Sequence, residues 1–292
     1  MRFLVPIVVA LLMVSIGMSL HLRELAATMR RLSWVRWLRL LLATFVLPAF
    51  LALVLGRVFR LERGELAGIF LVGVAPGAPL LTRNLAKKGF DMHLAATYQL
   101  WAALMIPIMI PLIVFVAGQL YSRSIWVSPS ALLWQIAEKQ LLPLAVGMVL
   151  ARLAPAITKK IQAPLNVLGN VLLTVFFVLI LWKLTPELRL ITPMLPVVSL
   201  LLALGCMAAV WVVGLEDPVV QETFAISNTT RHVGLAILLS GQYVRASHAI
   251  PAIACYAIAA PIVMIVYVRW SRRRGAAAKD ATSEPGNRLV SS

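Results

Sequence analysis

The chain has 292 residues, of which 61% are hydrophobic and only 13% are charged, and its formal net charge is +16. A water-soluble chain of this length cannot bury so large an apolar fraction. The composition therefore excludes a soluble domain and indicates a protein that crosses a lipid bilayer several times. The basic residues lie mainly between apolar runs, where they meet lipid headgroups and set topology, so no nucleic-acid partner is expected.

Apolar runs long enough to span a bilayer as a helix recur along the whole chain. We predict nine spanning helices, over residues 3–20, 34–58, 65–88, 92–121, 130–153, 163–183, 193–214, 219–241 and 246–270. The first run lacks a small-residue cleavage site and is expected to be a retained helix rather than a signal peptide. Residues 271–292 are rich in Arg, Ala, Ser and Gly and are expected to form a disordered cytoplasmic tail.

Lys and Arg are unevenly shared between the two sets of alternate connectors. One set, which includes the C-terminal tail, is richer in basic residues, although Arg57, Arg60 and Arg63 belong to the poorer set. Cytoplasmic loops carry the excess of positive charge. We therefore expect a multi-pass protein of the cell membrane, with its N-terminus outside and its C-terminus in the cytoplasm.

The third run is interrupted near its middle. Pro76 and Pro79 flank Gly77, and two prolines so close together remove two backbone donors and break the helix. About ten residues precede the break, roughly 15 Å of helix, which places it near the bilayer midplane. A polar triplet follows directly, Thr82, Arg83 and Asn84.

The eighth run carries a matching polar patch after about seven apolar residues. It consists of Ser227, Asn228, Thr229, Thr230, Arg231 and His232. Paired interruptions in two halves of a chain are typical of secondary transporters built from repeats, whose broken helix ends bind substrate or ion near the midplane. An arginine inside the membrane is costly, which favours a functional role for these residues.

Simpler explanations stay open for individual residues. Arg83 has the alternative of extending its side chain to the cytoplasmic surface. His232 is either a proton carrier or a hydrogen-bonded interior histidine. Cys206 and Cys255 lie inside apolar runs without metal-ligand spacing and are interpreted as small buried hydrophobic residues.

The sequence has no phosphate-binding loop, dinucleotide-binding turn, zinc-protease motif or CxxC pair, so an enzyme is not expected. A membrane sensor or an anion channel without coupled transport is the alternative to a transporter. A channel would show a filter or ring sequence, and a sensor would carry a signalling domain. Two interrupted helices fit alternating access better than either.

The order and spacing of several motifs resemble the bile acid:sodium symporter family over nearly the whole chain. These motifs are residues 17–20 (GMSL), Pro48, 73–79 (GVAPGAP), 142–148 (LPLAVGM) and 230–236 (TRHVGLA). The resemblance implies an all-α membrane protein of two inverted five-helix repeats with the first helix missing. Residues 1–121 would hold four helices and residues 130–270 five. The first, fifth and sixth runs would form a panel domain beside a core domain whose two broken helices cross.

The resemblance also implies secondary active transport of a small or amphipathic organic anion, with no cofactor beyond Na+ as a coupling ion. The residues at the positions of the family's sodium ligands are Ser227, Arg231, Ala43, Gln99 and Ala102. A carboxylate is lost and a positive charge is gained, which puts sodium coupling in doubt. We predict that Arg231, together with Arg83, acts as a built-in cation that pairs with the substrate. Neither substrate identity nor oligomeric state follows from the sequence.

Overall fold

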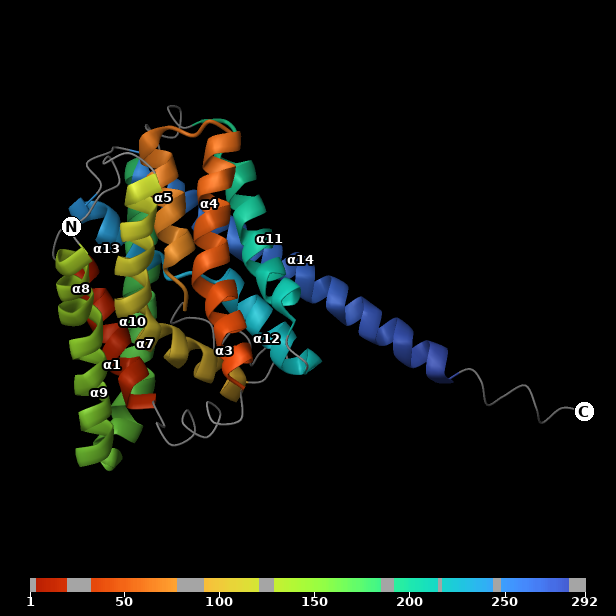
Figure 1. Cartoon of the computed structure of the whole chain (residues 1–292). Coiled ribbons are helices and arrows are strands. Elements are labelled where there is room, and N and C mark those ends of the chain that lie inside the picture. Colours follow the sequence, from red (N-terminus) through yellow and green to blue (C-terminus); the bar gives the residue numbers. More distant parts are fainter. Residues whose placement is uncertain are drawn as a thin grey trace, which may run out of the picture.

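The computed structural model describes residues 4–19, 33–77, 92–120, 129–184, 192–214, 217–243 and 248–283. This part of the chain is helical, with short links and one isolated β-bridge (Figure 1). The elements, in chain order, are α1 (Leu4–Ser19), α3 (Trp34–Leu41), η1 (Leu42–Val46), α4 (Leu47–Val58), α5 (Arg63–Val74), α7 (Met92–Leu120), α8 (Pro129–Ile136), η3 (Ala137–Leu141), α9 (Leu142–Leu153), α10 (Pro155–Leu184), α11 (Leu195–Val213), α12 (Pro218–Thr229), α13 (Val233–Tyr243) and α14 (Ala249–Ser283).

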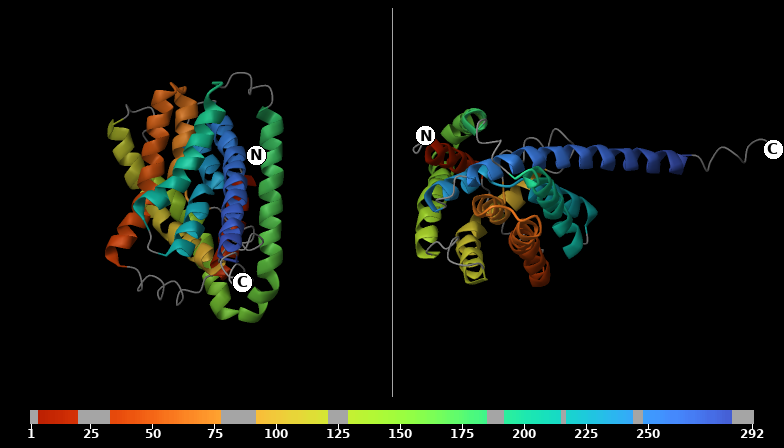
Figure 2. Two further views of the ribbon diagram at one scale, coloured as in Figure 1. Left: turned by 90° about the vertical axis from the view of Figure 1, so that its right-hand side faces the viewer. Right: turned by 90° about the horizontal axis from the view of Figure 1, so that it is seen from above.

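Four helices of the described part are long and apolar enough to cross a membrane. They are Trp34–Val58, Thr97–Gln119, Leu195–Val213 and Ala249–Ser271. Most of the helices run roughly along one direction and form a bundle, from which the C-terminal half of α14 projects (Figure 2). Large apolar side chains are exposed along the outside of these helices, as lipid contact requires.

Two long helices each contain a five-residue π-helical turn. In the first, α3, η1 and α4 follow without a break, and in the second α8, η3 and α9 do. Both π-helical turns are followed by a Leu-Pro pair, Leu47-Pro48 and Leu142-Pro143. A π-helical turn adds one residue to a helix, and such turns occur frequently at functional sites.

Two other helices are half-length. α5 and α12 each have 12 residues, roughly 18 Å of helix, which is short of a bilayer core. Their starts are fixed by capping. Glu62 and Glu65 form a capping box for α5, and the Asp217 carboxylate accepts from the N–H of Val219 at 2.8 Å ahead of α12.

The helices of the bundle fall on two sides. α1 packs against α9 and α10 on one side, and α4, α5, α11 and α14 pack together on the other (Figure 1). On the first side Gly17 of α1 and Gly147 of α9 allow backbone contact. A Cβ on Gly17 would lie 2.1 Å from the Leu144 carbonyl oxygen, and one on Gly147 would lie 2.2 Å from that of Val14.

The structure differs from the sequence expectation at the C-terminus. α14 continues to Ser283, into the segment expected to be disordered. Residues 272–274 are arginines and residues 276–278 are alanines, separated by Gly275. Arg and Ala have high helix propensity and outweigh the single glycine, so the helix continues after the apolar stretch ends.

Candidate functional site

The two interrupted helices meet at their breaks. α5 ends at Val74, and Pro76 pairs with Arg231 in an isolated antiparallel β-bridge. The N–H of His232 donates to the Ala75 carbonyl at 2.8 Å. Both interruptions predicted from the sequence are therefore present, and their extended residues pair with each other.

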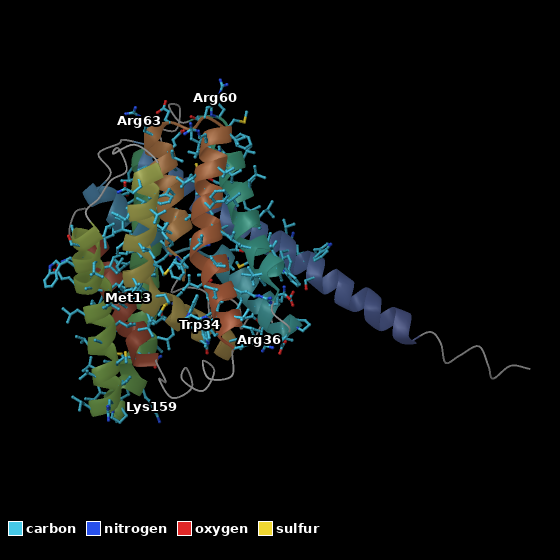
Figure 3. All side chains as sticks on the ribbon, viewed as in Figure 1. Met13, Trp34, Arg36, Arg60, Arg63 and Lys159 are labelled. Atoms are coloured by element: carbon cyan, nitrogen blue, oxygen red, sulfur yellow. The ribbon has the colours of Figure 1, made fainter. Side chains whose placement is uncertain are left out.

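We call the contact between Pro76 and Arg231, with the residues around it, the crossing. The half-helices α5 and α12 reach it from opposite ends of the molecule. α5 begins beside the end that carries Arg60 and Arg63, whereas α12 lies near the end that carries Trp34 and Arg36 (Figure 3). Both helices therefore point their C-terminal ends at the crossing. Each such end carries a partial negative charge, roughly half an elementary charge, which favours a cation there.

Three carbonyls in the last turn of α12 accept hydrogen bonds from side-chain hydroxyls. The Thr229 and Thr230 hydroxyls donate to the carbonyls of Ala225 (2.9 Å) and Ile226 (3.2 Å). The Tyr256 hydroxyl donates to the Thr229 carbonyl at 2.7 Å. Each of these oxygens therefore already has a hydrogen-bond donor within the chain.

A proline in a third helix supplies two further acceptors to the crossing. The N–H of Leu47 donates to Leu42, five residues earlier, and Pro48 has no N–H. The carbonyls of Ala43 and Thr44 consequently lack the helical donors they would have in a regular α-helix. Two polar side chains of the α12 break bind these carbonyls.

The buried Arg231 is one of the two side chains that bind these carbonyls. Its Nη1 donates to the Thr44 carbonyl at 2.8 Å, and its Nη2 lies 3.3 Å from the Cys206 Sγ. Its exposed fraction is 2%, and its Nε has no acceptor among the described residues. No described carboxylate forms an ion pair with it. The crossing therefore holds a cation whose charge is not balanced by a described side chain.

Asn228 is the second side chain that binds these carbonyls, and both of its polar side-chain atoms are hydrogen-bonded. Its Nδ2 donates to the carbonyls of Ala43 (3.0 Å) and Cys206 (2.7 Å), and its Oδ1 accepts from the Tyr98 hydroxyl at 2.7 Å. Asn228 thereby joins α12 to η1, α7 and α11 inside the bundle. It is completely buried, so these bonds replace those it would make with water.

His232 caps the second half of its broken helix. The N–H of Leu235 donates to its Nδ1 at 3.0 Å, as to an N-cap side chain at the start of α13. An Nδ1 that accepts carries no proton, so the ring is neutral with its proton on Nε2. That atom has no partner among the described residues. The geometry matches the hydrogen-bonded interior histidine, one of the two alternatives above.

Two more predicted residues have unpartnered polar atoms near the crossing. They are Gln99, through its Nε2, and Ser227, through its Oγ, and both side chains are buried. Gly77 lies beside Gln99, because a Cβ on Gly77 would come within 3.7 Å of the Gln99 carbonyl oxygen. Gly77 has a φ of +80°, a conformation that favours glycine.

The structure thus brings most of the predicted site together. Ser227 to His232, Gln99, Pro76 and Gly77 all lie at or beside the crossing. Pro79, Thr82, Arg83 and Asn84 lie outside the described residues.

Four residues that complete the crossing were not predicted. They are Thr44, Tyr98, Cys206 and Tyr256. Tyr, Thr and Cys are common in apolar helices, and no local pattern marks them. Pro48 is the signal that could have led to Thr44, because a proline inside a spanning helix frees the carbonyl four residues before it.

A polar stretch in the middle of α8–η3–α9 was also missed. Gln135 and Gln140 are buried, and their amide atoms have no partner among the described residues. Between them, Glu138 and Lys139 form an ion pair. The signal was visible in the sequence, since a charged residue at the centre of a spanning helix costs about 2.5–3.5 kcal/mol on insertion scales.

Comparisons with known proteins identify the family of this chain. A family model described as the sodium bile acid symporter family matches residues 6–217, which run from within α1 to just before α12 and include the α5 half of the crossing. No curated protein matches the chain. Among the described residues, no group of three or more His, Cys, Asp or Glu side chains is placed to hold a metal ion.

Proposed function

Because the chain belongs to the sodium bile acid symporter family, we propose that it moves an organic anion across the membrane by alternating access. Members of this family are multi-pass membrane transporters and not enzymes. The observation that carries the proposal is the pairing of Pro76 with Arg231, where two half-helices end inside the bundle. Unwound backbone at membrane depth is tolerated where it is buried in protein or lines a cavity, and transporters place their binding sites there.

The arrangement of the half-helices supports an inverted repeat. α5 and α12 have the same length and approach the crossing from opposite ends. An inverted repeat needs this relation, because its two halves are related by an axis in the membrane plane. In the proposed architecture of nine spans, α1, α8–α9 and α10 form the panel. The helices around the crossing form the core, and the N-terminus lies outside.

The described part of the crossing supports a mechanism without a sodium coupling ion. Sodium needs several free oxygens, preferably including a carboxylate. The carbonyls of Ala225, Ile226 and Thr229 already accept from hydroxyls. The family resemblance implies that Ser227 takes the place of a carboxylate ligand. Arg231 adds a fixed positive charge at the same point, which repels a second cation at close range. We propose that Arg231 takes the place of the ion.

The positive charge of Arg231 selects for an anionic substrate. The guanidinium has no carboxylate partner among the described residues, and its Nε edge is unpartnered. A guanidinium binds a carboxylate through two parallel hydrogen bonds. Because Arg231 is 2% exposed, the substrate reaches it when the crossing opens to one side. Arg83 is the second proposed cation, as the sequence predicts.

The test combines a binding screen with uptake. Organic acids, cholate included, are screened for an increase in the melting temperature of the purified protein, and those that bind are followed into proteoliposomes. We expect uptake to be equal in sodium and choline buffers. Arg231→Ala should reduce uptake at least about tenfold, since a charge-assisted bond of about 1.5–3 kcal/mol is lost. Arg152→Ala, at an exposed position on α9, is the control.

The built-in cation and the transport activity would be refuted by different results. Strict sodium dependence with a fully active Arg231→Ala variant would rule out the built-in cation. Binding without uptake of any acid by the wild-type protein would contradict transport and favour a sensor.

A further inference from the structure

The ion pair in the middle of the α8–η3–α9 helix is separate from the crossing. Glu138 and Lys139 are the tenth and eleventh residues of a helix that runs from Pro129 to Leu153. At 1.5 Å per residue they lie roughly 14 Å from its start, close to the middle of the segment that the sequence predicts to span the bilayer (residues 130–153). Ionisable residues at that depth mark function when they are not neutralised inside the protein.

These two side chains point away from the bundle. The Glu138 side chain is 47% exposed and that of Lys139 32% exposed, whereas Gln135 and Gln140 on the opposite face are buried. The exposed face also carries large apolar side chains. They are Trp134, Leu142, Val146, Val149 and Leu153. α8 and α9 lie at the edge of the molecule, on the side away from α3 and α11 (Figure 1).

Lys139 and Glu138 have only each other among the described residues. Adjacent residues on a helix do not normally face each other, and the pair forms within a π-helical turn. A half-exposed pair surrounded by apolar side chains is poorly placed in lipid, because neither charge can complete its hydrogen bonds there.

We propose that this face, which we call the α8–α9 face, binds a second copy of the same chain. The face is self-complementary, because it presents one negative and one positive charge side by side at one depth. A two-fold axis along the membrane normal places two copies in the same orientation and brings Glu138 of each copy to Lys139 of the other. The apolar residues above and below then pack against their own counterparts.

Charge complementarity is what selects this partner. A different protein would need the same two charges in the opposite order at the same depth, whereas a second copy supplies them by symmetry. Each ion pair then gains a second partner in a site shielded from lipid, and interhelical polar contacts of this kind stabilise association within membranes. The α8–α9 face lies apart from the crossing, so its role in assembly does not depend on transport.

Energy transfer between donor- and acceptor-labelled copies in liposomes measures the association, with the dye at the C-terminus. Wild-type transfer should rise with the protein-to-lipid ratio. Glu138→Lys alone and Lys139→Glu alone place like charges opposite each other, and each should weaken association at least about tenfold. Mixing the two variants, or combining both substitutions in one chain, should restore it. Arg39→Glu, an exposed charge reversal on α3, should change nothing.

The neutral double variant Glu138→Gln/Lys139→Gln guards against misfolding of a charge-reversed chain. It places no net charge in lipid, and it should weaken association without loss of folded protein. Unchanged association in both single variants, or no association of the wild type at any density, would overturn the proposal. A loss of anion uptake with unchanged association would show that the pair lines the substrate path instead.

Discussion

At the crossing, two neighbouring polar residues differ in how well their hydrogen bonds are satisfied. Asn228 uses both of its side-chain atoms on three partners, whereas the Arg231 guanidinium makes one bond to a carbonyl and one to a sulfur. A fully bonded buried amide stabilises the fold and fixes its geometry. A buried cation without a counterion costs free energy, so we assign Asn228 to stability and Arg231 to binding.

Asn228→Ala should destabilise the protein by about 2–4 kcal/mol. The substitution leaves the Ala43 carbonyl without a donor, at about 1–3 kcal/mol, and removes two further hydrogen bonds at about 1 kcal/mol each, partly relieved by repacking. The Cys206 carbonyl keeps its helical donor within α11, and the Tyr98 hydroxyl keeps the Thr44 Oγ1. Reversible unfolding in mixed micelles measures the change in the free energy of unfolding.

Tyr98→Phe is the matched control, because it removes one hydroxyl and leaves the two carbonyls bonded. Its cost should be about 1 kcal/mol. In the double variant the two costs should not add, since both substitutions break the bond between Tyr98 and Asn228. Equal costs for the two single variants, or full additivity, would contradict the assignment of Asn228.

Polarity in an apolar run was enough to predict part of this site. Arg231 and Asn228 are conspicuous in such a run, and both lie at the crossing. Cys206 and Tyr256 were not predicted, because their roles depend on contacts that are distant in the sequence. Cys206 contacts Arg231 at a separation of 25 positions, and Tyr256 contacts Thr229 at a separation of 27. An apolar helix contains many such residues, and only the packing of α11 and α14 selects these two.

Among the elements, the contact of α1 with α9 depends on two glycines. Without a hydrophobic driving force between helices in lipid, small residues that let backbones approach supply the contact. Gly17→Ala and Gly147→Ala would each place a methyl group within 2.2 Å of a backbone oxygen. We expect either variant to lower the free energy of unfolding by about 1–3 kcal/mol, as overpacking does, measured as above.

Gly241→Ala provides the comparison for these two variants. Gly241 lies in α13, and outside the local backbone of that helix nothing lies within 4 Å of the position its Cβ would take. Alanine is the better helix former, so the variant should be neutral or more stable by about 0.5–1 kcal/mol. The same loss at all three glycines would mean that steric contact between α1 and α9 is not the cause.

The ends of helices could be predicted from the sequence where prolines or polar residues interrupt an apolar run. The breaks at Pro76 and at Thr230 to His232 follow from prolines and polar residues in apolar runs. In the structure α5 ends at Val74 and α12 at Thr229, with α13 resuming at Val233. The π-helical turns were not predicted, because one inserted residue leaves the composition of a helix unchanged. Pro48 and Pro143 each follow such a turn, yet a proline alone predicts only a kink.

For the whole molecule, the distribution of basic residues predicts which end faces the cytoplasm. Arg63 and Lys159 are exposed at opposite ends of the bundle (Figure 3). Cysteine at position 63 should react with a membrane-impermeant maleimide added outside intact cells, and cysteine at position 159 should react only after permeabilisation. The background is Cys255→Ser, since Cys206 is fully buried.

The opposite labelling pattern would invert the proposed orientation. Labelling of both positions in intact cells would show that the chain inserts in two orientations, a result that the basic loop around Arg63 would explain. The parental protein without either new cysteine reports any background from Cys206.

The Arg231 guanidinium is part of the protein, so it cannot be released together with the substrate as a coupling ion would be. This difference determines how the proposed transport cycle is driven. Sodium that is released on the far side dissipates a concentration gradient and so drives accumulation, whereas Arg231 stays behind at the crossing. A monovalent anion neutralises it on the way across, and the empty carrier returns with one positive charge. Membrane voltage therefore acts on the return step, and unlabelled anion on the far side should accelerate exchange.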